Sequence, residues 1–162
     1  MTRAELQSVL RSAGVHTSGW MLLDNEFEPV SLERVRAIAQ ACLDSLPSEL
    51  VTWREVGGGK SVRVPLWVAE AGDCETHSIV LWAWAMVGNW LKAVREGKRG
   101  GLALGFLVYV AQPKPGNTRQ GHHAIVWFVD HARQVRFYEF GDNSETTLSS
   151  DELFTVSYGF AA

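Results

Sequence analysis

Three residues of the types that together activate a thiol occur in the second half of the chain: Cys74, His123 and Glu139. Cys74 follows Gly72 and Asp73 at the expected start of a helix, where unpaired N–H groups and the helix dipole favour a thiolate. A thiolate is a nucleophile, and the same N–H groups can bind an oxyanion formed on an attacked carbonyl. Histidine is the base that such a thiol needs. These residues therefore predict nucleophilic chemistry centred on Cys74.

His123 and Glu139 are predicted on neighbouring strands of one hairpin, which turns at Asp130 to Arg133. That hairpin places Glu139 within one residue of the position opposite His123, and a bulge or the turn type decides whether both face one side. A carboxylate there can hold the imidazole by its second nitrogen, which is the orienting role in a triad. Asp142 is a nearby substitute in that role. Alternatively, Glu139 forms a cross-strand ion pair with Arg136.

A helix and a set of strands must position these residues. The strongest helical pattern runs from Cys74 to Glu96, and because Ile79 to Leu91 is apolar on nearly every side, we expect this helix to be buried in the core. Further helices are predicted before Pro47, and strands at 51–56, 60–64, 102–111, 123–129, 134–140 and 153–158. The predicted fold class is α+β, with one buried central helix packed on an antiparallel sheet and the N-terminal helices outside.

Length and composition limit the classes of protein that are possible. The chain has 162 residues, of which 46% are hydrophobic and 20% charged, so we expect one folded domain, 1–162. Its N-terminal helical part covers about 1–47 and its helix-plus-sheet core about 50–160. A net charge of −3 argues against nucleic-acid binding, and no apolar run is long enough to span a membrane. Cys42 and Cys74 are too few for a disulfide scaffold, so we expect a cytoplasmic protein. Cys42 lies on an apolar helix face, and we expect it to be a small buried hydrophobic residue.

The motifs around the three residues resemble a known superfamily. The segment GDCETHS with its hydrophobic helix, then GHHAIVWFVD and VRFYEF, resembles the transglutaminase-like branch of the papain-like cysteine enzymes. It is similar to bacterial and phage proteins with a D-C-[DE] motif, then H-A-[VI], then an acid on the next strand. The resemblance covers roughly residues 66–140. It implies a papain-like or transglutaminase-like fold in which Cys74 is the nucleophile, His123 the base and Glu139 the orienting acid.

The pattern and the resemblance together predict a cysteine hydrolase or acyltransferase. It would act on an amide or ester bond through a Cys-His-acid triad, with a thioester intermediate and no cofactor. Its partners would be a peptide, a peptidoglycan-like polymer or a small amide or ester substrate. The segment from Gln112 to Gln120, rich in proline and glycine, is the predicted substrate-covering loop.

Two other functions stay open. Thr76, His77 and Ser78 depart from the family's pattern, and 10% of the residues are aromatic, which favours a non-catalytic binding module on the same fold that recognises a sugar, a peptide or a partner protein. Cys74 and His77 are three residues apart, on one helical face. With His123 and an acid they could complete a tetrahedral zinc site.

Overall fold

The computed structural model describes residues 1–16, 20–56, 58–68, 73–97, 100–113 and 121–161. Its helices are α1 (Arg3–Ser12), α2 (Leu32–Ser45), α3 (Cys74–Glu96) and α4 (Ser150–Phe154), with 3-10 turns η1 (Ser48–Leu50) and η2 (Phe140–Asp142). Its strands are β1 (Met21–Leu22), β2 (Phe27–Glu28), β3 (Val51–Glu55), β4 (Ser61–Pro65), β5 (Gly101–Leu102), β6 (Leu104–Ala111), β7 (Gly121–Val129), β8 (Val135–Glu139), β9 (Ser144–Thr146) and β10 (Tyr158–Ala161).

The main sheet holds six strands in the order β1-β10-β6-β7-β8-β9. Its centre is the antiparallel pair β6 and β7, which runs in register from Leu104 opposite Phe128 to Ala111 opposite Gly121. The other neighbours are also antiparallel, except that β1 lies parallel to β10. The predicted antiparallel pairing of the strands at 102–111, 123–129 and 134–140 is confirmed, but the sheet as a whole is mixed rather than antiparallel. Short loops predict antiparallel hairpins, but β1 reaches β10 from the other end of the chain, where no hairpin fixes its direction.

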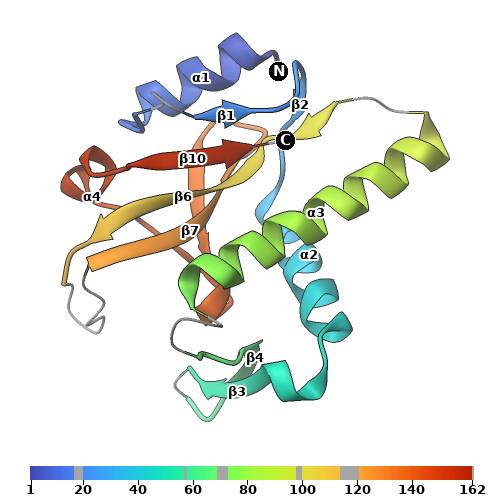
Figure 1. Cartoon of the computed structure of the whole chain (residues 1–162), viewed down its shortest axis with the longest axis vertical. Helices are drawn as coiled ribbons and strands as arrows, with labels where there is room; N and C mark the ends of the chain where they lie inside the picture. Colours follow the sequence, from blue (N-terminus) through green and yellow to red (C-terminus); the bar gives the residue numbers. More distant parts are fainter. Residues whose placement is uncertain (17–19, 57, 69–72, 98–99, 114–120, 162) are drawn as a thin grey trace.

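Both faces of the central strands are covered, by α1 on one side and by α2 and α3 on the other (Figure 1). Because successive strand side chains alternate, Trp127 packs with Leu10 of α1, whereas its neighbour Phe128 packs with Leu81 of α3. Each of these four side chains is fully buried. The long apolar runs of β6 and β7 thus supply two cores at once, which fixes the position of α3 against the sheet.

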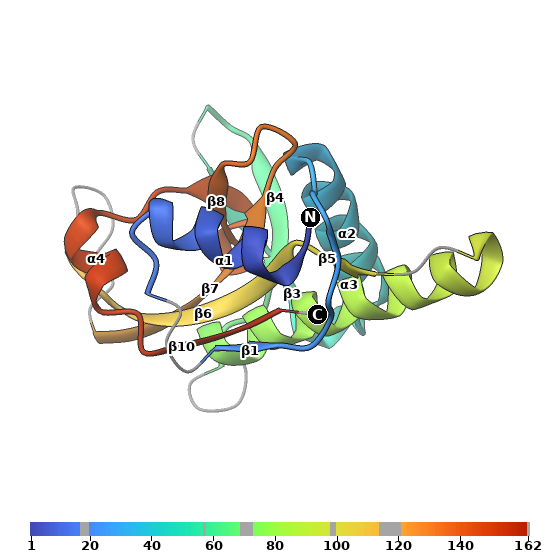
Figure 2. The same ribbon diagram turned by 90° about the horizontal axis from the view of Figure 1, so that it is seen from above.

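Helix α3 has the bounds that the sequence predicts, but it is buried only along one face of its first half. Its buried residues end at Ala85, whereas Val87, Trp90 and Val94 are exposed. A helix of 23 residues is about 34 Å long, and Figure 2 shows its second half extending beyond the rest of the molecule. The expectation of a wholly buried helix is wrong, because the pattern of a helix does not reveal how far its sheet reaches. None of the described helices is long and apolar enough to cross a membrane.

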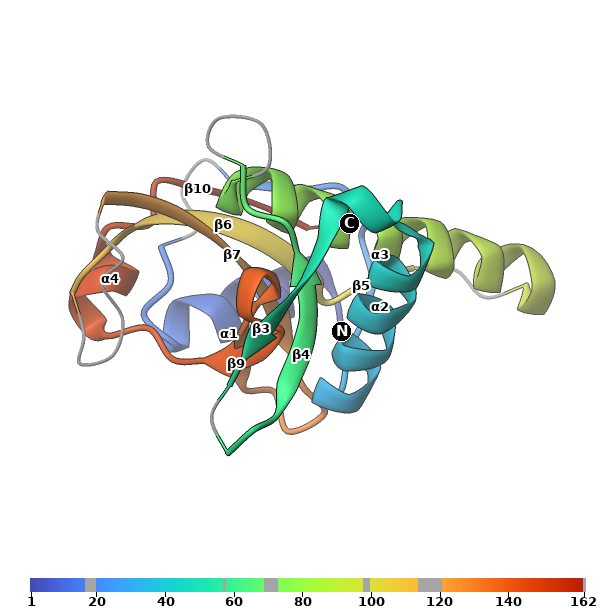
Figure 3. The same ribbon diagram turned by 90° about the horizontal axis from the view of Figure 1, so that it is seen from below.

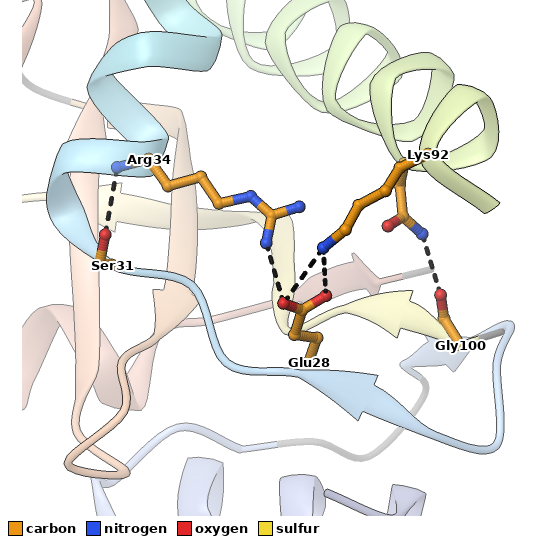
Figure 4. Close-up of polar contacts among 6 residues, drawn as sticks. Glu28, Ser31, Arg34, Lys92 and Gly100 are labelled. Carbon is orange, nitrogen blue, oxygen red and sulfur yellow. Dashed lines mark hydrogen bonds and ion pairs between the residues drawn. The ribbon is translucent and has the colours of Figure 1, made fainter. Parts of the chain in front are cut away.

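A charged cluster ties the exposed half of α3 to the body. Lys92 Nζ lies 3.2 Å from the carboxylate of Glu28 in β2, and Arg34 Nη1 of α2 contacts the same carboxylate at 3.2 Å (Figure 4). Ser31 caps α2 by accepting the Arg34 N–H at 3.2 Å. One carboxylate therefore joins β2 to both helices.

Strands β3 and β4 form a two-stranded ribbon apart from the main sheet (Figure 3). Two contacts hold the ribbon to the turn that follows β8. Arg54 pairs with Asp142, and Asn143 Nδ2 donates to the backbone carbonyl of Arg63 at 3.3 Å. The ribbon thus lies beside the end of β8, where Glu139 is found.

Candidate functional site: a buried thiol, imidazole and carboxylate

Cys74 is the first residue of α3. The helix starts there because the Asp73 side chain caps it, with Oδ1 accepting the Thr76 N–H at 3.1 Å. The Cys74 side chain is 8% exposed and packs against Val108 of β6 and Ala124 of β7. Its Sγ accepts a hydrogen bond from the backbone N–H of Ala124 at 3.4 Å. The sulfur therefore lies against the strand that carries the histidine, and a backbone donor is aimed at it.

His123 and Glu139 form a buried pair, 6% and 4% exposed. Nε2 of His123 lies 2.6 Å from Oε2 of Glu139, while Oε1 of Glu139 accepts the Gly141 N–H at 3.1 Å. A β-carbon at residue 141 would lie only 3.1 Å from Oε1 of Glu139, so the glycine at this position avoids a close contact with the carboxylate. Both carboxylate oxygens are thus engaged, which is what a buried carboxylate requires.

The strand register explains how the two side chains meet. Val126 pairs with Tyr138, so Glu139 follows at the position opposite Ile125. His123 lies two residues further along β7, and residues two apart on a strand face the same side. From the sequence, either the turn type or a bulge could have decided whether the two side chains share a face. The register set by the turn places both on one face, and the paired residues of β7 and β8 contain no bulge.

The charges of the site favour a protonated imidazole. Burial of His123 opposes the charge, but its hydrogen bonds to Cys74 and Glu139 outweigh burial and raise its pKa to about 9. Because Nε2 is engaged by Glu139, we assign the hydrogen bond with the Cys74 thiol to Nδ1. The imidazole is thus placed to take the proton of Cys74, and the N–H of Ala124 is placed to stabilise the sulfur anion.

The alternative partners that the sequence allowed are engaged elsewhere. Asp142, the suggested substitute for Glu139, pairs with Arg54 of the ribbon. Arg136, the suggested ion-pair partner of Glu139, instead makes two contacts with Glu145, at 2.5 and 2.8 Å. The structure therefore brings Glu139, rather than Asp142, to His123.

His77 lies one turn after the thiol, and its Nδ1 lies near Gly141, beside the carboxylate of Glu139. Its Nε2 lies 3.2 Å from the carbonyl oxygen of Leu66, its ring is nearly perpendicular to the ring of Trp67, and burial lowers its pKa. Across the described parts of the chain, no three or more His, Cys, Asp or Glu side chains are grouped to hold a metal ion. The zinc site of Cys74, His77 and His123 is accordingly not formed there.

Sequence reasoning missed the backbone donors of the site. The N–H groups of Ala124 and Gly141 contact the sulfur and the carboxylate, and a backbone N–H has no signature in a sequence. It also missed an apolar cavity of about 180 Å³ between α2, β4 and α3, lined by His77, Leu66 and Phe140 among others. Of the predicted covering loop, Gln112 to Gln120, residues 114–120 lie outside the described part of the chain.

No family model matches this chain, and no curated protein matches it. Solved structures share its fold, and two of them are described here. One, described as a PSL1a–E64 complex, is 19% identical with a TM-score of 0.66, over 99% of this chain and 50% of that chain. The other is Polyporus squamosus lectin bound to the human-type influenza-binding epitope Neu5Acα2-6Galβ1-4GlcNAc, 19% identical with a TM-score of 0.64, over 99% of this chain and 49% of that chain. This chain thus spans about half of theirs, and the likeness is one of fold.

This comparison contradicts several predictions. The structures similar in fold are lectin chains, so the assignment to the transglutaminase-like or papain-like superfamily is overturned, together with the fold class drawn from it. The same comparison contradicts the prediction of a cysteine hydrolase with a catalytic triad. It also contradicts the predicted peptide, peptidoglycan-like and amide or ester substrates. A cysteine before an apolar helix and a histidine on a strand make a short pattern, and a short pattern does not define a family. The comparison favours the binding-module alternative over the hydrolase or acyltransferase.

Proposed function

We propose that this chain is a carbohydrate-binding module that also carries a chemically reactive thiol at Cys74. The comparisons support the first part, and the contacts among Cys74, His123 and Glu139 support the second. The two parts are independent of each other, so each has its own experiment.

The observation that carries carbohydrate binding is that nearly the whole chain, 99% of it, shares its fold with part of a lectin that was solved with a bound glycan. Titration of the isotope-labelled protein with Galβ1-4GlcNAc and with its α2-6-sialylated form tests this part by NMR. We expect saturable chemical-shift changes in a localised set of residues at millimolar or lower glycan. Glycerol, a polyol without a ring, is the control ligand. Spectra that stay unchanged with both glycans would reject carbohydrate binding.

The observation that carries the reactive thiol is the buried chain of contacts from sulfur to imidazole to carboxylate. His123 takes the thiol proton, and Glu139 holds the resulting imidazolium by Nε2. The thiolate is held by the Ala124 N–H and by the first turn of α3. A thiolate prepared in this way is a nucleophile toward the electrophilic carbon of an added reagent.

An epoxide such as E64 tests this chemistry directly. Attack by the Cys74 sulfur forms a C–S bond and breaks a C–O bond of the epoxide, and the proton from His123 converts the alkoxide to a hydroxyl. We expect intact-mass measurement to find one adduct per chain, and peptide mapping to place it on Cys74. The Cys74→Ala variant should take up none, whereas Cys42→Ala should react like the wild type. An adduct on Cys42, or none at all, would reject the reactive thiol.

A further inference from the structure

An exposed tryptophan lies on the ribbon beside a groove. Trp53 of β3 is 70% exposed. It stands directly opposite Arg63 of β4, and opposite residues of an antiparallel pair share one face. This face borders a groove of about 680 Å³, which we call the ribbon groove, between the ribbon and the C-terminal end of α2. Its volume falls within the range of small-ligand sites.

The wall of the ribbon groove opposite the ribbon carries polar side chains whose hydrogen-bonding capacity is partly used. Asp44 Oδ1 accepts from Gln40 Nε2 at 2.8 Å and from Arg63 Nη1 at 2.9 Å. Both bonds go to one oxygen of a half-exposed carboxylate, so its Oδ2 faces no donor within the described residues. The amide oxygen of Gln40 is a second acceptor. The groove thus combines an open aromatic face with oxygen acceptors held in place by Arg63.

This combination matches the two surfaces of a sugar ring. A pyranose has an apolar face of C–H groups, which packs on an aromatic ring, and an edge of hydroxyl groups, which donate to carboxylate and amide oxygens. The charges of Asp44 and Arg63 neutralise each other, which favours an uncharged ring. By contrast, the exposed Trp90 of α3, at 68%, stands near exposed Val87 and Val94. These two neighbours are apolar and offer a sugar no hydrogen-bond acceptor.

We infer that the ribbon groove binds a neutral pyranose of a glycan, with the ring stacked on Trp53 and its hydroxyls bonded to Asp44 and Gln40. This inference rests on the proposed carbohydrate binding and adds the place at which it occurs. It also separates glycan binding from Cys74, because none of the groove residues contacts the thiol.

Titration of matched tryptophan variants with Galβ1-4GlcNAc tests the inference. Truncation of an aromatic residue at the centre of a binding site weakens binding by about tenfold or more, so Trp53→Ala should do so. Trp53→Phe keeps a stacking ring and should bind within a few-fold of the wild type. Trp90→Ala removes an equally exposed ring elsewhere and should bind as the wild type does. Because both rings are exposed, we expect all three variants to keep the wild-type circular dichroism spectrum.

The outcomes separate the two proposals. If the wild type binds and Trp53→Ala binds equally well, the ribbon groove is not the site, although carbohydrate binding stands. If Trp90→Ala is weakened as much as Trp53→Ala, the groove assignment is likewise wrong. If the wild type binds neither glycan, carbohydrate binding fails and the groove assignment fails with it.

Discussion

Alkylation by iodoacetamide should distinguish the two cysteines of this chain sharply. Cys42 is 1% exposed, and burial raises its pKa to about 11. At pH 7 about one Cys42 in ten thousand is a thiolate, against about 3% of an ordinary thiol. A more basic thiolate is also a better nucleophile, and this raises the reaction rate of the Cys42 thiolate by about tenfold. Cys42 should therefore react at least about 30-fold more slowly than an ordinary thiol, and its burial slows it further.

Cys74 should react faster than Cys42 because His123 accepts its proton and the Ala124 N–H stabilises the anion. We expect a difference in rate of about 100-fold or more at pH 7, measured by intact mass with peptide mapping over time. The Cys42→Ala and Cys74→Ala variants isolate the two thiols, and His123→Ala in the Cys42→Ala background should slow the remaining reaction. Equal rates for the two cysteines, or faster labelling of Cys42, would refute the reasoning.

Four further predictions concern stability. An alanine β-carbon at Gly105 would lie 1.7 Å from the carbonyl oxygen of Phe160, so Gly105→Ala should lower the free energy of unfolding by more than about 3 kcal/mol or prevent folding. Gly88 lies in the exposed half of α3, and a β-carbon there would meet nothing within 4 Å. Gly88→Ala should therefore raise the free energy of unfolding in urea by about 0.5–1 kcal/mol. Leu81 is 0% exposed, so Leu81→Ala should cost about 2–5 kcal/mol, and a loss below 1 kcal/mol would contradict its place in the core. Because the pKa of His123 is raised from 6.5 to about 9, its contribution is complete below pH 6.5 and is lost as the pH rises through 9. Urea unfolding of the wild type should show a fall of about 3 kcal/mol at most over that interval, and an equal fall in His123→Gln would contradict this.

The sequence predicts most of the local structure that surrounds the site. Asp73 before a long apolar segment indicated a helix starting at Cys74, and that helix is confirmed. Apolar runs rich in β-branched and aromatic residues predicted the strands now labelled β6, β7 and β8. These features follow from spacing within one element, so a single sequence contains them.

Features that depend on distant parts of the chain could not be predicted in the same way. The parallel pairing of β1 with β10 joins the two ends of the described chain, and the exposed half of α3 depends on how far the sheet extends. The ribbon groove brings Asp44 to Arg63, on separate elements with no shared motif. The family assignment failed for a related reason, since it rested on short motifs around Cys74 and His123.

The most direct test of the reactive thiol is an NMR titration of the His123 side chain with ¹⁵N-labelled imidazole. The contacts with Cys74 and Glu139 predict that His123 keeps its proton at neutral pH and releases it at about pH 9. Glu139→Gln removes one cause of the raised pKa and should lower the pH of that release. If His123 of the wild type loses its proton near its ordinary pKa of about 6.5, and Glu139→Gln leaves the titration unchanged, then no such coupling exists and Cys74 has no activating base.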